Sequence, residues 1–503
     1  MPEGEDLICP KCGSALTEYG ANLRRGTETR RSGDAKKEAR EPGAKTHSKA
    51  LMIAILAAVA VIIGIGGYLA WLKLHGPKAA GEGSPKNTIL RLAGSNTIGD
   101  SLAPSLAEAF LKNQGATEVR TLAGTNPQEK IVQGVLPGDS SPSFITISAH
   151  GSATAFTALG DGKCDIGMAS RKIKPEEAGK LSALGDMTSA ASEHVVGLDG
   201  IAVIVNAYNP INQLDKDRIM RIFSGEITDW SQVGSPRGAI EVYARDDNSG
   251  TFDTFKSLVL GAKPLTPKAL RIEDSKELSD AVAGDPNAIG FIGLPYILSA
   301  KPIAVSEKGM LSLLPTRLSV ATEDYLLSRR LYFYTPAISQ NKFARQFVEF
   351  SLSRRGQDVV GASGFVAQNV ALVTQAVPEN APGEYKALTQ NANRLTLDFR
   401  FETGQTVLDN KAKVDLDRVV SLIADLKITG DRVMLFGFSD PVGNPDTNRA
   451  LSLARAKAIA DEFSLRGLNP AIVRGYGSDL GVASNDSQEG QQKNRRVEIW
   501  IKN

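Results

Sequence analysis

The chain has 503 residues, 42% of them hydrophobic, with 58 basic and 56 acidic side chains. This length and composition predict two or three folding units with buried cores. The balanced charge argues against a nucleic-acid partner, and three cysteines are too few for a framework of disulfides.

The first 50 residues are predicted to be a basic cytoplasmic segment that is mostly disordered, because residues 20–49 are rich in charged residues and glycine and nearly free of large apolar ones. Such a segment favours contact with membrane lipid. Cys9 and Cys12, in the sequence CPKCG, have the spacing of half a zinc ribbon. A structural zinc site needs four ligands, so a complete site would require a second chain or a partner, and a metal-free segment is the alternative. No other cofactor is indicated.

Residues 51–72, LMIAILAAVAVIIGIGGYLAWL, form an apolar run without a charge. At a rise of ~1.5 Å per residue, a helix of this length would be roughly 33 Å long and would span a bilayer. The run begins too far along the chain, and is too long, for the core of a signal peptide. Residues 24–49 hold nine basic and four acidic side chains. The positive-inside rule therefore predicts a single-pass inner-membrane protein with a cytoplasmic N-terminus and a periplasmic C-terminus.

After a Gly/Pro/Lys-rich linker at residues 73–87, strand-like and helix-like segments alternate from residue 88 to residue 375, which predicts an α/β fold. In three places an apolar strand leads into small polar residues and then into a helix. Helix starts offer free N–H groups and partial positive charge, so three convergent junctions would bind an anion, whereas each one alone is an ordinary helix cap. Arg245 adds a full charge at the third junction. The other residues concerned are Ser95, Asn96, Thr97, Ser152, Ser249, Gly250 and Thr251.

This span resembles the substrate-binding proteins of phosphate ABC transporters, in phrases such as GSNTIGDSLAPSLAEAF, FSGEITDW and RDDNSGT. The resemblance implies a two-lobed, type II-like periplasmic-binding-protein fold in which the junction residues line a cleft for phosphate or a similar oxyanion. It also implies an ABC permease as a partner. Arg171 stands where many phosphate binders have an Asp that accepts a proton from the ligand. As a cleft residue it would strengthen general anion binding and weaken selection for a protonated anion; the alternative is a surface residue.

Residues 376–393, rich in Pro, Ala and Asn, are predicted to connect to an independent α/β unit at residues 394–503. In that unit the apolar segment VMLFGF leads to Asp440, and a helix starting near Asn448 carries Arg455. Asn448, Ser452 and Arg455 are spaced to share one helix face. An acid beside a guanidinium suits a zwitterionic ligand. In an earlier helix we expect mostly core-facing positions at Val414, Leu416, Val419, Val420, Ile423 and Leu426.

This unit resembles the OmpA-like peptidoglycan-binding domain, from LTLDFRFETGQTVL to the terminal NRRVEIWI. The resemblance implies that Asp440, Asn448 and Arg455 hold the diaminopimelate of peptidoglycan. Two positions depart from the family pattern. Phe438 stands where His is frequent, and Gln491 stands where Arg is frequent.

These features predict a membrane-anchored periplasmic solute-binding protein that attaches to peptidoglycan, and not an enzyme. A chain held by both membrane and wall has a restricted reach, so an envelope sensor or scaffold that delivers no cargo to a transporter is the first alternative. A hydrolase is the second, and the lack of an acid/base pair or metal cluster in the motifs counts against it.

Overall fold

The computed structural model describes residues 85–247, 249–307, 310, 312–486 and 488–503. Cys9, Cys12 and the apolar run at 51–72 lie outside this part of the chain, so the zinc site and the membrane anchor stay predictions. Within the described ranges, no helix combines the length and the apolar character that a membrane crossing requires.

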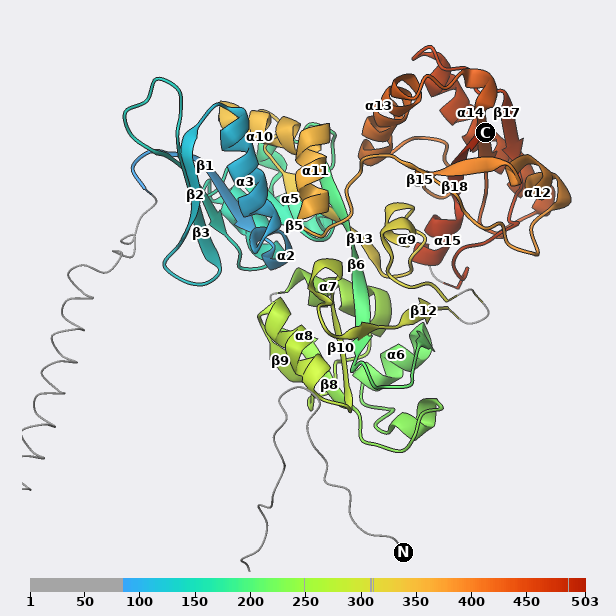
Figure 1. Ribbon diagram of the computed structural model, residues 1–503, viewed down its shortest axis with the longest axis horizontal. Helices are drawn as coiled ribbons and strands as arrows, with labels where there is room; N and C mark the ends of the chain where they lie inside the picture. Colours follow the sequence, from blue (N-terminus) through green and yellow to red (C-terminus); the bar gives the residue numbers. More distant parts are fainter. Residues whose placement is uncertain (1–84, 248, 308–309, 311, 487) are drawn as a thin grey trace, which may run out of the picture. The chain divides into compact units, whose positions relative to one another are not determined.

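The larger domain is built on a sheet of eleven strands within the described residues (Figure 1). The strand order is β2-β3-β4-β1-β5-β13-β6-β10-β8-β9, with β11 paired to β6, and β12 and β7 form a separate two-stranded sheet. The strands are β1 (Thr88–Gly94), β2 (Thr117–Ala123), β3 (Glu129–Val135), β4 (Ser143–Ser148), β5 (Ile166–Ala169), β6 (Glu193–Val205), β7 (Gln213–Asp215), β8 (Glu241–Arg245), β9 (Leu270–Ile272), β10 (Ala288–Gly293), β11 (Lys301–Pro302), β12 (Ala304–Ser306) and β13 (Ser328–Tyr334).

Strand β6 connects two halves of this sheet. Its residues 193–200 pair with β13, and its residues 201–205 pair with β10. We call the part around β1 to β5 the first lobe and the part around β8 to β10 the second lobe. Because β13 runs antiparallel beside β6 and also pairs with β5, both strands pass between the lobes. The predicted α/β periplasmic-binding-protein fold is confirmed.

Helices cover the sheet with apolar faces of helical period. In α3, for example, Leu102, Leu106 and Phe110 recur every four residues and are all buried, and the Phe110 ring meets Phe347 of α10 edge-on at 5.4 Å. The helices of this domain are α2 (Asn96–Gly99), α3 (Leu102–Asn113), α4 (Ser152–Gly160), α5 (Pro175–Lys180), α6 (Lys216–Phe223), α7 (Gly250–Phe255), α8 (Ser275–Gly284), α9 (Arg317–Ala321), α10 (Lys342–Leu352) and α11 (Arg354–Ala362).

The C-terminal domain is a second α/β unit with a sheet in the order β14-β15-β18-β16-β17. Asp409 and Asn444 cap its two long helices, α13 and α14, by accepting hydrogen bonds from N–H groups of the first turn. Its elements are β14 (Leu372–Val373), α12 (Gly383–Thr389), β15 (Ala392–Arg400), α13 (Asn410–Asp425), β16 (Val433–Gly437), α14 (Pro445–Ser464), β17 (Ile472–Gly475), α15 (Gln488–Asn494) and β18 (Arg496–Lys502).

The segment 376–393 differs from the predicted connection. It contains α12 and the start of β15, and Tyr385 of α12 is buried against Phe436 and Trp500. Strand β14 also pairs with β15, so residues 372–373 belong to the C-terminal sheet. Ala381 of this segment is buried as well, and Val377 and Leu388 pack against the same cluster, so the segment is ordered although its average apolar content is low.

Helix α13 bears out the predicted core face only in part. Leu416, Val419 and Ile423 are buried and Val420 is partly buried, but Val414 is 36% exposed and Leu426 is 48% exposed. The prediction was wrong for these two residues. Leu426 caps the helix end, and Val414 lies two positions from Leu416, which turns it about 200° away on a helix of 3.6 residues per turn.

Ion pairs join the two domains. The Nη1 atom of Arg330, on β13, lies 2.5 Å from the carboxylate of Asp409 at the start of α13. The Nη2 atom of Arg400, on β15, lies 2.8 Å from the carboxylate of Asp324, just before β13. The C-terminal domain therefore contacts the larger domain at the start of the connecting strand β13.

Candidate functional site

The three strand-to-helix junctions predicted from the sequence meet between the lobes. The hydroxyl of Thr97, at the start of α2 in the first lobe, lies 3.1 Å from the hydroxyl of Thr251, at the start of α7 in the second lobe. Ser95, Ser152 and Ser249 are buried beside them. The structure thus gathers small hydroxyl side chains from both lobes into one buried region.

Gly250, at the third junction, lies directly against the hydroxyls of Ser152 and Ser170. A Cβ atom at this position would lie 2.1 Å from the Ser170 hydroxyl oxygen and 2.4 Å from that of Ser152. The Ser152 hydroxyl accepts a hydrogen bond from the backbone N–H of Ser170 at 3.0 Å. The close approach therefore requires glycine, and Ser170 is a cleft residue that the sequence reasoning missed.

Two predicted residues have local bonds as well. The Ser249 hydroxyl accepts from the N–H groups of Thr251 and Phe252, so it caps α7. The Asn96 amide donates to the carbonyl of Ala149 at 2.7 Å. The Asn96 Oδ1 atom and the Ser95 hydroxyl are buried and find no hydrogen-bond partner in the described part of the chain.

Arg245 supplies a buried positive charge at the end of β8. Its side chain is 2% exposed, its Nη1 atom donates to the Ser275 hydroxyl at 2.7 Å, and its Nη2 atom lies 3.7 Å from the carboxylate of Asp246. Its Nε atom has no partner among the described residues. Burial lowers the pKa of Arg245; the Asp246 charge opposes this, and the charge of Arg329 lowers the pKa further.

Arg329 and Asp199 form a second charged pair at the same place, which the sequence reasoning missed. They lie on the connecting strands β13 and β6, are buried, and approach to 2.6 Å. Arg329 also reaches the hydroxyls of Thr97 and Thr251. The signal in the sequence is one charge, Asp199, in the apolar strand GLDGIAVIV and two, Arg329 and Arg330, in the strand SRRLYFY.

Arg171 is held by carboxylates from both lobes. Its guanidinium binds Glu177 through two hydrogen bonds of 2.8 and 2.7 Å, and its Nε atom lies 3.4 Å from Asp253 of α7. The side chain is 12% exposed and stacks over the ring of Phe156. It is therefore not a surface residue, and its pairing with Asp253 contributes to contact between the lobes.

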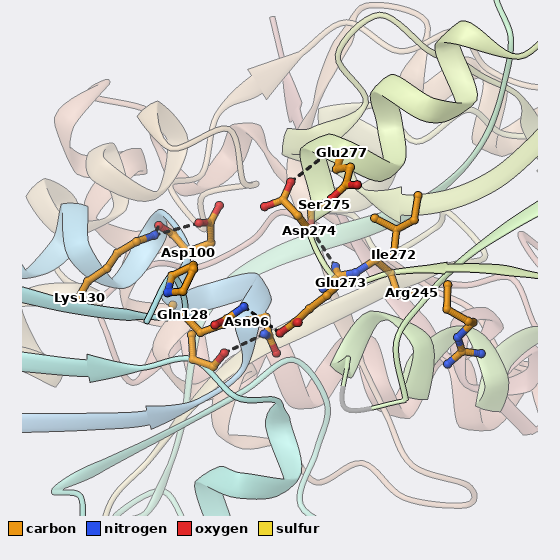
Figure 2. A pocket seen from close by; sticks show the side chains of 14 residues that line it. Asn96, Asp100, Gln128, Lys130, Arg245, Ile272, Glu273, Asp274, Ser275 and Glu277 are labelled. Atoms are coloured by element: carbon orange, nitrogen blue, oxygen red, sulfur yellow. Dashed lines mark hydrogen bonds and ion pairs between the residues drawn. The ribbon is translucent and has the colours of Figure 1, made fainter. Parts of the chain in front are cut away.

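A cavity of about 400 Å³ has Asn96 and Arg245, but none of the buried hydroxyl residues named above, in its wall (Figure 2). Residues of both lobes line it. Gln128 of the first lobe donates to the carboxylate of Glu273 of the second at 3.0 Å, as Figure 2 shows. The region combines buried donors and hydroxyls with a polar opening, which is suited to holding a small anion by hydrogen bonds.

The C-terminal domain places two of its three predicted residues on one face of α14. Asn448 and Arg455 are buried on α14, and Asp440 is nearly buried in the loop before it. Arg455 donates to the carbonyls of Gln405, Glu402 and Phe438, at 3.1, 3.3 and 3.4 Å. Burial, together with the charge of Arg495, lowers the pKa of Arg455 to about 10.

The ion pair of Asp440 is made with Arg495. The Asp440 carboxylate lies 3.1 Å from the Nη1 atom of Arg495 and also accepts from the N–H of Val442 at 3.1 Å. No ion pair between Asp440 and Arg455 occurs in the described residues. Arg495 lies in the terminal sequence NRRVEIWI, but it was not among the residues predicted to bind the ligand. The site therefore holds two guanidinium groups around one carboxylate.

Metal binding finds no support within the described ranges, where no group of three or more His, Cys, Asp or Glu side chains could hold an ion. Cys9 and Cys12 fall outside these ranges.

Two protein families match separate parts of the chain. The profile of the PBP superfamily domain matches residues 93–355, just over half of the chain, and the chain belongs to this family. The profile of the OmpA family matches residues 400–495. The predictions of a periplasmic-binding-protein-like domain and a C-terminal OmpA-like domain are confirmed.

Individual relatives share the larger domain. The chain is 26% identical over 229 residues to the phosphate-binding protein PstS of Borreliella burgdorferi, covering 44% of this chain and 79% of that protein. It is 28% identical over 238 residues to the phosphate-binding protein PstS of Staphylococcus aureus, covering 46% of this chain and 71% of that protein. Among solved structures, an ABC-type phosphate transport receptor from Vibrio cholerae is 24% identical, with a TM-score of 0.43, and covers 55% of this chain and 99% of that chain.

Proposed function

We propose that the cleft of the larger domain binds inorganic phosphate or a similar oxyanion. The observation that carries this proposal is Arg245, a buried guanidinium whose Nε atom lacks a partner in the described residues and which lies in the region where hydroxyls of both lobes meet. Leaving a charged donor unpaired in a buried site costs free energy, and a bound anion would remove this cost. The names of the PstS relatives favour phosphate as the first ligand to test.

The proposed contacts come from both lobes. Ser95, Thr97 and Ser152 would donate from the first lobe, and Arg245, Gly250 and Thr251 from the second. Asn96 and Ser249 would support the two helix starts, Asn96 through its bond to Ala149 and Ser249 as the cap of α7. Arg171 would act through its ion pairs, because two carboxylates already match its charge.

The C-terminal domain is proposed to bind peptidoglycan at diaminopimelate. In this arrangement Asp440 faces the ammonium group, Arg455 faces the carboxylate, and Asn448 completes the pocket. The match to the OmpA family supports the assignment, as does the shared helix face of Asn448 and Arg455 on α14 with Asp440 in the loop before it.

The chain as a whole is then a solute-binding protein of the cell envelope that does not transform its ligand. The apolar residues 51–72 would anchor it in the inner membrane, with residues 1–50 in the cytoplasm and both domains in the periplasm. Both domain types support an envelope location. An ABC permease and membrane lipid are the corresponding partners.

Isothermal titration calorimetry of the full-length protein with inorganic phosphate, and with sulfate for comparison, tests the cleft assignment. We expect saturable binding of phosphate at one site per chain, and a rise in the unfolding temperature with phosphate concentration. No heat with either anion, together with an unchanged unfolding temperature, would exclude the proposal.

A further inference from the structure

The guanidinium of Arg329 contacts both lobes from a strand that connects them. Its Nε and Nη2 atoms donate to the Asp199 carboxylate at 3.0 and 2.6 Å. The same Nη2 atom lies 2.9 Å from the Thr251 hydroxyl and 3.4 Å from the Thr97 hydroxyl. Thr97 and Thr251 belong to different lobes, so Arg329 can contact both only while the lobes are closed.

The remaining nitrogen of this side chain is unused. The Arg329 side chain is 3% exposed, and its Nη1 atom is buried without a hydrogen-bond partner in the part of the chain that the structure describes. The other charge nearby does not satisfy it, because Arg245 is also a cation and its Nε atom is equally unpaired. Two buried guanidinium groups with unpaired nitrogens therefore lie beside a cluster of hydroxyls. This arrangement favours the binding of an anion.

Asp199 does not compete for the free nitrogen. Its Oδ2 atom accepts both bonds from Arg329, and its Oδ1 atom accepts from the N–H of Leu294 at 3.0 Å. Two N–H groups that converge on one carboxylate oxygen restrain the orientation of the guanidinium.

We propose that Arg329 is a direct ligand of the bound anion, donating through Nη1, and that Asp199 is its positioning residue. The inference rests on the oxyanion-binding function proposed above, to which it adds a second cationic ligand. Arg329 then also links anion binding to closure of the two lobes. The same rigid guanidinium would bind the anion through Nη1 and contact the two threonines through Nη2. The anion and the closed arrangement of the lobes thereby stabilise each other.

A purely structural role for Arg329 is the competing explanation, in which the arginine only neutralises Asp199. The double variant Arg329→Gln/Asp199→Asn separates the two, because it removes both charges, leaves the net charge unchanged and keeps hydrogen-bonding groups of similar size. A structural arginine would be replaced without effect on binding. A ligand arginine would not, since the amide lacks the charge that strengthens a bond to an anion.

The test is phosphate titration of the full-length double variant by calorimetry. We expect its affinity to fall about 10- to 100-fold, the range of one charge-assisted hydrogen bond. Arg330→Gln is the matched control: Arg330 is the next residue on β13, pairs with Glu323 and Asp409, and should leave the affinity unchanged. An affinity of the double variant within twofold of the wild type would overturn the inference and leave the proposed function intact, whereas a wild type that binds neither phosphate nor sulfate would overturn both.

A second variant covers the case in which the double variant does not fold. Arg329→Lys keeps the charge opposite Asp199 but has one nitrogen in place of the three of a guanidinium, so it cannot reach Asp199, the threonines and the anion together. We expect roughly a tenfold loss of phosphate affinity. Wild-type affinity in this variant, or a crystal structure with phosphate in which Nη1 of Arg329 contacts no phosphate oxygen, would refute the assignment.

Discussion

The replacement Gly250→Ala tests whether the cleft closes as the structure shows. The new Cβ atom would lie 2.1 Å from the Ser170 hydroxyl oxygen and 2.4 Å from that of Ser152. Carbon and oxygen atoms in ordinary contact are roughly 3.4 Å apart, so α7 must move by about 1 Å or both hydroxyls must turn away. Turning the Ser152 hydroxyl breaks its bond from the Ser170 N–H. Every route therefore disturbs groups that we assign to the anion.

The expected size of the effect follows from the contacts that a shift of about 1 Å would break. The Thr97–Thr251 contact of 3.1 Å and the Arg329–Thr251 contact of 2.9 Å would both exceed hydrogen-bonding distance. Two lost hydrogen bonds at about 1 kcal/mol each give about 2 kcal/mol, or roughly a 30-fold weaker affinity for phosphate.

Calorimetric titration with phosphate measures this loss, and Gly284→Ala is the matched control. Gly284 ends α8, and no atom lies within 4 Å of a Cβ built there, so this change should leave affinity unaltered. If Gly250→Ala binds phosphate within twofold of the wild type while it remains folded, the close packing of α7 on the first lobe does not contribute to binding, and the reasoning fails.

Three further predictions concern other groups. Arg245→Lys should weaken phosphate binding at least about tenfold in the same titration, because one ammonium nitrogen cannot occupy the positions of both Nη1, which binds Ser275, and the unpaired Nε; equal affinity would exclude Arg245 as a ligand. Asp440→Ala combined with Arg455→Ala should abolish co-sedimentation with purified peptidoglycan sacculi while phosphate binding persists, and a double variant that still pellets would contradict the wall-binding assignment. Burial lowers the pKa of His194 from 6.5 to about 4. Between these pH values the unfolded chain binds one more proton than the folded chain. The free energy of unfolding should therefore fall as pH drops from about 6.5 toward 4, by up to about 3 kcal/mol. Urea denaturation at pH 7.5 and pH 5 measures this loss; a His194→Gln variant should lack part of it, and an identical pH dependence in that variant would contradict the prediction.

The sequence predicted the parts of the cleft that depend on local chain order. Apolar strands that end in Gly and Ser or Thr identify helix starts, and Thr97, Gly250 and Thr251 do meet between the lobes. The partner of each residue could not be predicted, because partners come from distant segments. Arg329 is 130 positions from Asp199 and 232 from Thr97; the pairing of β13 with β6 brings the first two together, and the packing of α2 adds the third.

The C-terminal domain shows the same limit in its side-chain pairing. The helical spacing of Asn448, Ser452 and Arg455 was sufficient to place them on one face of α14. It did not reveal that the carboxylate of Asp440 would pair with Arg495, which lies near the C-terminus, directly before β18. The ordered segment around Tyr385 was also missed. Ala381, Tyr385 and Leu388 lie at helical spacing and pack in one cluster, but so short a run among proline and polar residues does not identify a helix.

Arg329 and Arg330 are adjacent on β13, and successive side chains of a strand point to opposite faces. One face carries the guanidinium that contacts Asp199 and the threonines, and the other carries the guanidinium that binds Asp409 of the C-terminal domain. Adjacent residues of β13 therefore contact hydroxyls of the two lobes on one face and the C-terminal domain on the other. A force transmitted through the Arg330–Asp409 ion pair would act on the strand that carries Arg329.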